Sequence, residues 1–75
     1  MILPPKSDPK WTKLIEHVSS VQMTSLPGRM LMNRLKLKVM FDPSPAAKQQ
    51  AISDAYDFFA KNQAELQDDI KLIFG

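Results

Sequence analysis

The sequence has no cysteine and only two glycines, Gly28 and Gly75, among its 75 residues. The absence of cysteine excludes disulfides and thiolate metal sites, and the scarcity of glycine excludes a glycine-rich phosphate loop. Small secreted domains usually carry disulfides, so this composition favours a reducing compartment. The chain also lacks a secretory signal pattern and any apolar run as long as a membrane span. We therefore expect a cytoplasmic protein without a transmembrane segment.

Groups suited to catalysis are scarce as well. His17 is the only histidine, and its neighbour Glu16 would point to another face of a helix. The later acids form two groups that lack the oxygen-rich loop spacing of a calcium site, and we expect them to be solvated: Asp54 with Asp57, and Glu65 with Asp68 and Asp69. We expect no catalytic residue, no metal, no cofactor and no enzymatic activity in this chain.

The length allows one small domain, residues 1–75, in which the proline-rich segment 1–7 is expected to be flexible. A domain of this size buries only about 60% of the surface that its unfolded chain exposes. Its core alone supplies roughly 3–5 kcal/mol of stability. Because no disulfide can add to this, another protein or a second copy of the chain is the expected source of further stability.

The first periodic segment follows Ser7, Asp8 and Pro9. Either Ser7 or Asp8 can cap a helix, and Pro9 suits the first turn because its missing N–H would have no partner there. Apolar residues then recur at helical spacing as far as Val21, and the charged residues lie off that stripe. This pattern predicts an amphipathic helix of about three turns that ends near residues 19–20.

Helical signals also dominate the C-terminal part of the chain. Asp42-Pro43-Ser44-Pro45 is a stop signal followed by a start signal, with Ser44 as the cap. Asn62 can cap a further segment, with Glu65 reaching back as in a capping box. Two helices in series are therefore predicted. One long helix over residues 44–74 is the alternative, because nothing in the intervening sequence forbids it.

Residues 22–28 connect the first helix to the next element. Pro27-Gly28 is a strong turn signal, because proline presets one central residue of a turn and glycine tolerates positive φ at the next. Ser25 can instead cap a following helix whose first turn contains Pro27. Both interpretations are compatible with the residues of this stretch.

Segment 29–41 is ambiguous between strand and helix. As a strand, it alternates apolar residues with Arg34, Lys36 and Lys38. As a helix, it carries two apolar stripes, Leu31, Leu35 and Val39 in one and Met30, Leu37 and Phe41 in the other. Its residue types favour a helix, and a lone strand would have only the short stretch 21–25 to pair with. We interpret it as a helix with neighbours on both sides.

These elements predict an all-α fold, a small bundle of three to four helices. The alternative is an α+β fold in which residues 31–41 form a strand. In either case the large apolar residues of the periodic segments are assigned to the core, and they are Trp11, Leu14, Val18, Phe58, Phe59 and Leu66.

Charge is unevenly distributed within a net charge of +2. Basic side chains are in excess in residues 1–40 and acidic ones in residues 41–75, so the halves can attract each other within one fold. A basic surface can also meet an acidic partner. Methionines cluster around the same basic segment and suit surfaces that adapt to partners. The candidate interface that follows is Arg29, Met30, Arg34, Lys36 and Lys38.

We therefore expect a non-enzymatic regulatory, adaptor or accessory protein that binds another protein with an acidic surface, with self-association as a further option. The competing hypothesis is a dimeric DNA-binding regulator. A strand carrying Arg34, Lys36 and Lys38, followed by two helices, resembles the ribbon–helix–helix family over residues 33–74. That resemblance implies a dimer that presents these three side chains to the major groove.

Overall fold

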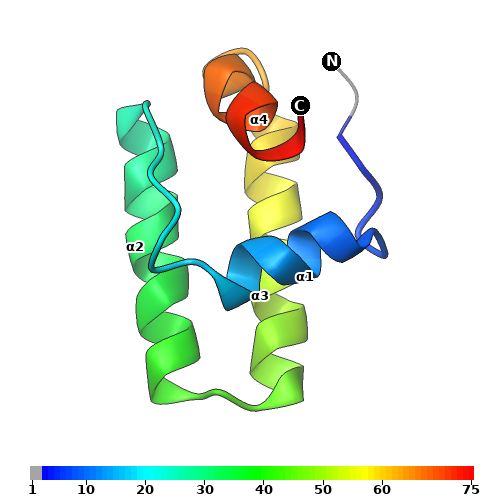
Figure 1. Ribbon diagram of the computed structural model, residues 1–75, viewed down its shortest axis with the longest axis vertical. Helices are drawn as coiled ribbons and strands as arrows, with labels where there is room; N and C mark the ends of the chain where they lie inside the picture. The colour runs from blue at the N-terminus through cyan, green and yellow to red at the C-terminus, as the bar shows by residue number, and fades with distance from the viewer. Residues whose placement is uncertain (1–2) are drawn as a thin grey trace.

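The computed structural model describes residues 3–75, and these form four α-helices (Figure 1). The helices are α1 (Pro9–Glu16), α2 (Leu26–Phe41), α3 (Pro45–Lys61) and α4 (Gln67–Phe74). α2 and α3 lie side by side and antiparallel, α1 crosses them, and α4 lies at the end of the bundle where α2 begins and α3 ends (Figure 1). The prediction of an all-α bundle of three to four helices is confirmed.

The strand alternative for residues 31–41 is wrong, because these residues belong to α2 and the part of the chain that the structure describes contains no strand. The stretch 21–25, the only candidate pairing partner, is an irregular connection that leads into α2. A strand at 31–41 would have left its backbone hydrogen bonds unmade, whereas a helix satisfies them locally. The ribbon–helix–helix fold is therefore excluded, and the basic side chains project from a helix.

Two helix starts follow the sequence prediction closely. At α1 the Asp8 carboxylate accepts a hydrogen bond from the backbone N–H of Lys10 at 2.9 Å. At α3 the Ser44 hydroxyl oxygen accepts from the N–H of Ala47 at 3.2 Å. In both helices a proline occupies the first turn, where its lack of an N–H leaves no intrahelical bond unmade.

Ser25 caps the start of α2, as one of the two interpretations of this stretch predicted. The other interpretation, a turn at Pro27-Gly28, is wrong. The Ser25 hydroxyl oxygen accepts from the N–H of Gly28 at 3.1 Å, and Pro27 lies in the first turn of the helix. Gly28 does not use a positive φ. It is buried, and a Cβ at this position would lie 2.5 Å from a carboxylate oxygen of Asp69. Glycine is therefore needed here for close approach and not for a turn.

α1 ends at Glu16, earlier than the predicted residues 19–20. Residues 17–20 continue as turns, in which the N–H of Ser20 donates to the carbonyl of His17 at 2.9 Å. Val18 is still buried. The apolar stripe therefore runs past the helix end, because a turn can bury a side chain as well as a helix can.

The break between α3 and α4 exists, but its predicted chemistry is wrong. Asn62 does not cap α4. It ends α3, where its side-chain amide donates to the carbonyl of Phe58 at 2.9 Å. α4 begins after Leu66 without a side-chain cap, and Leu66 is fully buried. The chain therefore changes direction between Lys61 and Gln67, where Leu66 packs into the core. The alternative of one long helix over residues 44–74 is also excluded.

Trp11 lies at the centre of the core with no exposed area. Its ring packs against Tyr56, Phe59 and Phe74 with centroid distances of 5.6, 5.7 and 4.6 Å. Its indole N–H donates to the carbonyl of Pro4 at 2.9 Å, so the buried polar atom has a partner. One residue of α1, two of α3 and one of α4 thus meet in a single aromatic cluster.

The core assignment is correct for Trp11, Leu14, Val18, Phe59 and Leu66, which are all buried. Phe58 is only half-buried, since it lies at the edge between α2 and α3. Of segment 1–7, for which we expect flexibility, residues 1–2 lie outside the described part. Leu3 is buried against the core.

Candidate protein-interaction surface

One face of α2 packs into the protein, and the opposite face is exposed. Gly28, Leu31 and Leu35 lie on the inner face and are buried. Five large apolar side chains project from the outer face, and we call them the outer ridge: Leu26, Met30, Leu37, Met40 and Phe41. Their exposed fractions range from 52% for Leu37 to 85% for Phe41. Elsewhere in residues 3–75, only Leu72 of α4 is a comparably exposed large apolar residue.

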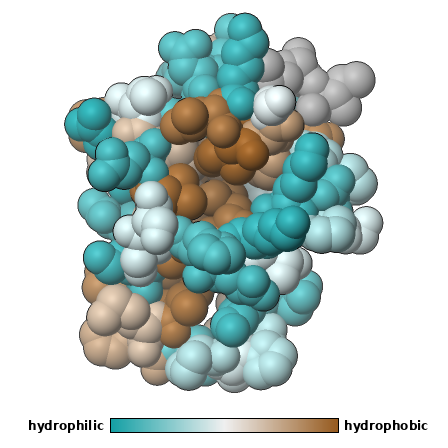
Figure 2. Space-filling view, viewed as in Figure 1, coloured by the Kyte–Doolittle hydropathy of each residue, from teal (hydrophilic) through white to brown (hydrophobic). Residues whose placement is uncertain are grey.

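The outer ridge is concentrated on one element. Figure 2 shows exposed apolar atoms at the lower left, over the C-terminal end of α2, the half that carries Leu37, Met40 and Phe41. Single exposed apolar residues are normal on a protein surface, whereas a continuous group of them usually marks an interaction site.

The sequence predicted part of this face. Met30, Leu37 and Phe41 were expected as a second stripe that packs against a neighbouring helix. That expectation is wrong, because α1 and α3 both pack on the inner face of α2. Leu26 and Met40 had no place in the predicted interface. Helical spacing along 26–41 was the signal that could have found them, once Ser25 is known to cap a helix that begins at Leu26.

The structure separates the five residues of the predicted interface. Met30 belongs to the outer ridge. Arg29, Arg34 and Lys36 are exposed beside it. Lys38 is exposed too, but it turns toward α3, where its ammonium lies 2.8 Å from a carboxylate oxygen of Asp54. Met30, Arg29 and Lys36 therefore lie on the outer surface, whereas Lys38 and the guanidinium of Arg34 turn toward α3.

Arg29 contacts the chain that precedes α2. Its Nε donates to the carbonyl of Met23 at 3.1 Å, across the irregular connection. This bond holds one nitrogen of the guanidinium against the connection that precedes α2. Met23 itself is buried. The arginine thus has a structural contact as well as a place next to the outer ridge.

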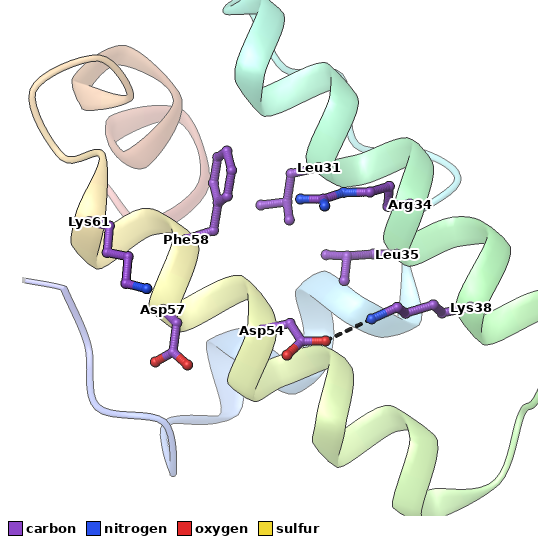
Figure 3. Close-up of a pocket in the computed structure, with 8 residues that line it drawn as sticks. All are labelled: Leu31, Arg34, Leu35, Lys38, Asp54, Asp57, Phe58 and Lys61. Atoms are coloured by element: carbon purple, nitrogen blue, oxygen red, sulfur yellow. Dashed lines mark hydrogen bonds and ion pairs between the residues drawn. The ribbon is translucent and has the colours of Figure 1, made fainter.

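A groove of about 420 Å³ lies between α2 and α3 (Figure 3). Leu31 and Leu35 of α2 and Phe58 of α3 point toward one another across it (Figure 3). The guanidinium of Arg34 lies 5.9 Å from the centre of the Phe58 ring, within the range of a cation–π contact. Charged side chains from both helices make up the rest of the lining: Lys38, Asp54, Asp57 and Lys61.

Lys38 and Asp54 form an ion pair across this groove. Lys38 bonds one oxygen of Asp54, and the side-chain amide of Gln50 donates to the other at 3.0 Å. The hydrogen bonds from Lys38 and then from Gln50 hold the pKa of Asp54 below its usual value, although partial burial acts in the other direction. A second ion pair, Lys6 with Asp57 at 3.6 Å, also joins the basic half to the acidic half. Some of the excess basic charge of residues 1–40 therefore pairs with acidic residues of the second half within the fold.

Asp69 is the one charged residue of segment 3–75 that is fully buried. One of its carboxylate oxygens accepts from both the N–H and the hydroxyl of Thr24 at 2.7 Å. The other oxygen accepts from the N–H of Ser25 at 3.3 Å and from the Ser25 hydroxyl. Asp69 therefore ties α4 to the start of α2.

The expectation that Asp69 is solvated is wrong, whereas Glu65 and Asp68 of the same group are exposed as expected. Burial raises the pKa of Asp69, but the hydrogen bonds from Ser25 and Thr24 outweigh this and leave it below its usual value. No local signal could have found this contact, because its partners lie 44 and 45 residues away.

The other groups considered for chemistry remain at the surface. His17 is exposed, with Nδ1 3.0 Å from the carbonyl oxygen of Lys13. Across residues 3–75, no three His, Cys, Asp or Glu side chains are arranged to hold a metal ion. The same part of the chain includes no helix with the length and apolar character needed to cross a membrane.

Comparisons of the chain with models of protein families, with curated proteins and with solved structures find no match.

Proposed function

We propose that this protein binds another protein through the outer ridge of α2, and that it acts as a non-enzymatic regulatory, adaptor or accessory factor in the cytoplasm. One observation carries the proposal: five large apolar side chains on a single helix face are 52–85% exposed. Covering such an apolar surface with a partner removes it from water, and this lowers the free energy of the complex.

The composition of the surface suits reversible association. Burying the exposed part of one large apolar side chain contributes roughly 1–2 kcal/mol, so a few of them supply useful affinity. Two of the five, Met30 and Met40, have flexible side chains that adapt to the shape of a partner. Arg29, Arg34 and Lys36 beside them speed the encounter with an acidic surface.

DNA binding by the same segment is the competing function. The sequence suggested DNA binding through a pair of strands formed by residues 31–41 of two copies. Residues 31–41 are helical, so this strand pair cannot form. On α2 the apolar residues of the outer ridge lie among the basic ones, whereas phosphate contacts are made by a basic surface that tracks the nucleic acid backbone. Protein binding therefore has the stronger support.

A photo-crosslinking amino acid at two matched positions tests the proposal. Leu37 in the outer ridge and Leu72 in α4 are both exposed leucines, at 52% and 62%. In the native host, we expect the probe at Leu37 to form an adduct with a discrete protein, which mass spectrometry identifies, and the probe at Leu72 to form none with that protein. The same adducts at both positions, or none at Leu37, would contradict the proposal.

A titration of the purified protein with duplex DNA separates the two functions. Each phosphate contact adds about 0.9 to the negative slope of log affinity against log salt concentration. We expect negligible affinity at physiological salt. Tight binding that weakens steeply with salt, and that disappears when Arg34, Lys36 and Lys38 are replaced by alanine, would establish the DNA-binding alternative instead.

A further inference from the structure

Five positions on the outer face of α2 follow the alternating spacing of a coiled-coil helix. Residues 26, 30, 33, 37 and 40 are separated by four, three, four and three residues. This spacing aligns side chains along one face, where a second helix can pack against them. We call these positions the seam: Leu26, Met30, Asn33, Leu37 and Met40. All five are exposed, and four of them belong to the outer ridge.

We propose that the seam docks one amphipathic helix of another protein, and that this helix carries acidic residues on both sides of its own apolar stripe. The inference rests on the proposed function and adds the chemistry of the partner. α2 has 16 residues, which corresponds to a length of about 24 Å. The seam can therefore seat a partner helix of about four turns.

The charges beside the seam select an acidic partner. Arg29 and Lys36 each precede an apolar seam residue and flank one side, and Arg34 follows Asn33 and flanks the other. All three residues are exposed, and residues 17–41 contain no acid. The guanidinium of Arg34 also lies 5.9 Å from the centre of the Phe58 ring on α3, so Arg34 borders both the seam and the groove. In coiled coils, residues at these flanking positions form the interhelical ion pairs that determine the choice of partner.

A second copy of this chain does not offer the opposite charges that the residues beside the seam require. If two α2 helices paired in parallel, Arg29 of one copy would face Arg34 of the other across the seam. If they paired antiparallel, Arg34 would face Arg34, and Arg29 would face Lys36. Only like charges meet in either orientation, and such contacts oppose association. The occupant is therefore a different protein with the opposite charge.

Asn33 at the middle of the seam adds a requirement for register. A polar residue at such a position lowers the stability of a helix pair but specifies which residues face each other, because its amide needs a hydrogen-bonding partner once it is covered. The partner helix should therefore place one polar residue opposite Asn33. An apolar residue there would leave the amide without a partner in the docked state.

Designed peptides of about 21 residues, three heptads each, provide the test. The first peptide has leucine at the stripe positions, glutamate at the flanking positions and one asparagine at the central stripe position. A matched peptide replaces every flanking glutamate by lysine, and a third replaces the asparagine by leucine. Binding of each to the full-length protein is measured by fluorescence anisotropy. We expect the glutamate peptide to bind at least about tenfold more tightly than the lysine peptide, and 1 M salt to reduce the difference.

Variants of the protein test whether the seam is responsible. Arg34→Glu together with Lys36→Glu changes one residue on each flank and should reverse the preference, so that the lysine peptide binds more tightly. Leu37→Ser should abolish binding of both peptides, and Leu72→Ser, the matched exposed leucine of α4, should leave it unchanged. Circular dichroism of each variant confirms that its helices are retained.

The outcomes separate this inference from the proposed function. Equal binding of the glutamate and lysine peptides, or tighter binding of the leucine-substituted peptide, would overturn the acidic, register-specific partner while leaving protein binding by the outer ridge intact. A dimer in sedimentation that Leu37→Ser dissolves would show that a second copy covers the seam. If no peptide binds although the probe at Leu37 crosslinks a protein, the partner is not such a helix.

Discussion

At the scale of single residues, the carboxylate of Asp69 joins two distant parts of the chain. It has no exposed area and accepts hydrogen bonds from the backbone and the hydroxyls of Thr24 and Ser25. Ser25 is at the same time the cap of α2. The acid therefore orients the cap, and the N-terminal end of the helix dipole favours its negative charge.

Replacing Asp69 by asparagine should destabilise the protein by about 2–3 kcal/mol. The amide keeps the size of the side chain, but it presents N–H groups to donors and forfeits hydrogen bonds to a charged acceptor. Urea unfolding followed by circular dichroism measures the change. Asp68→Asn is the matched control, because Asp68 is exposed, and it should stay within about 0.5 kcal/mol of the wild type. Equal effects of the two substitutions would contradict the structural role of Asp69.

The same carboxylate predicts a dependence of stability on pH. Its pKa in the folded protein is lowered from the ordinary value of 3.8, so the folded state binds this proton more weakly than the unfolded state. The contribution of Asp69 is therefore fully present above the pKa of the unfolded chain and is lost as the pH falls through the lower pKa of the folded one. Urea unfolding from pH 6 to pH 2 should show the gap between wild type and Asp69→Asn closing below about pH 4. A constant gap would contradict this assignment.

At the scale of elements, α2 has two distinct faces and is fastened near both ends. Asp69 holds its start through Ser25, and Lys38 pairs with Asp54 of α3 near its C-terminal end. Between these contacts, Leu31 and Leu35 are buried on the inner side. The outer ridge is therefore displayed on a helix whose position does not depend on a partner, which reduces the ordering cost of binding.

Gly28→Ala tests the close approach at the start of α2. Alanine is the better helix former by about 1 kcal/mol, so an open position would be stabilised by the change. A Cβ at residue 28 would lie 2.5 Å from Asp69 Oδ2 and 2.9 Å from Ser25 Oγ, and both atoms are held in the hydrogen-bonded cap. We expect net destabilisation by about 1–3 kcal/mol in urea unfolding. A more stable variant would show that Asp69 can move without cost.

At the scale of the whole molecule, the core is small and organised by aromatic contacts. Trp11 of α1 contacts Tyr56 and Phe59 of α3 and Phe74 of α4. Leu31 and Leu35 bring α2 into the same buried cluster. With so few large side chains, each one carries a considerable share of a total stability of roughly 0.05–0.15 kcal/mol per residue.

Phe59→Ala should therefore come close to unfolding the protein. Phe59 has no exposed area, and its ring contacts both Trp11 and Phe74. Removing a buried phenylalanine costs about 3–5 kcal/mol, which is comparable to the whole stability expected for a chain of this length. Thermal and urea unfolding measure the loss. Phe41→Ala, at a phenylalanine that is 85% exposed, is the control and should change stability by less than about 0.5 kcal/mol.

The sequence by itself determined the features that depend on neighbouring residues. The starts at Asp8 and Ser44 and the stop at Asp42-Pro43 were predictable, since each involves hydrogen bonds or steric contacts within about three residues. The helical character of residues 29–41 followed from residue preference and from the lack of a strand partner. Most of the core, with Trp11 at its centre, followed from helical spacing.

Only the tertiary structure decided which faces are covered. Asp69 could not be told from Asp68 in the sequence, because its partners are 44 and 45 residues away. Asn62 has the local pattern of a cap for a following helix, but the burial of Leu66 places the turn elsewhere. The outer stripe of α2 became a surface because α1 and α3 both pack on its other face. Spacing shows which side chains share a helix face, but only contacts between distant segments determine whether another helix covers that face or leaves it exposed.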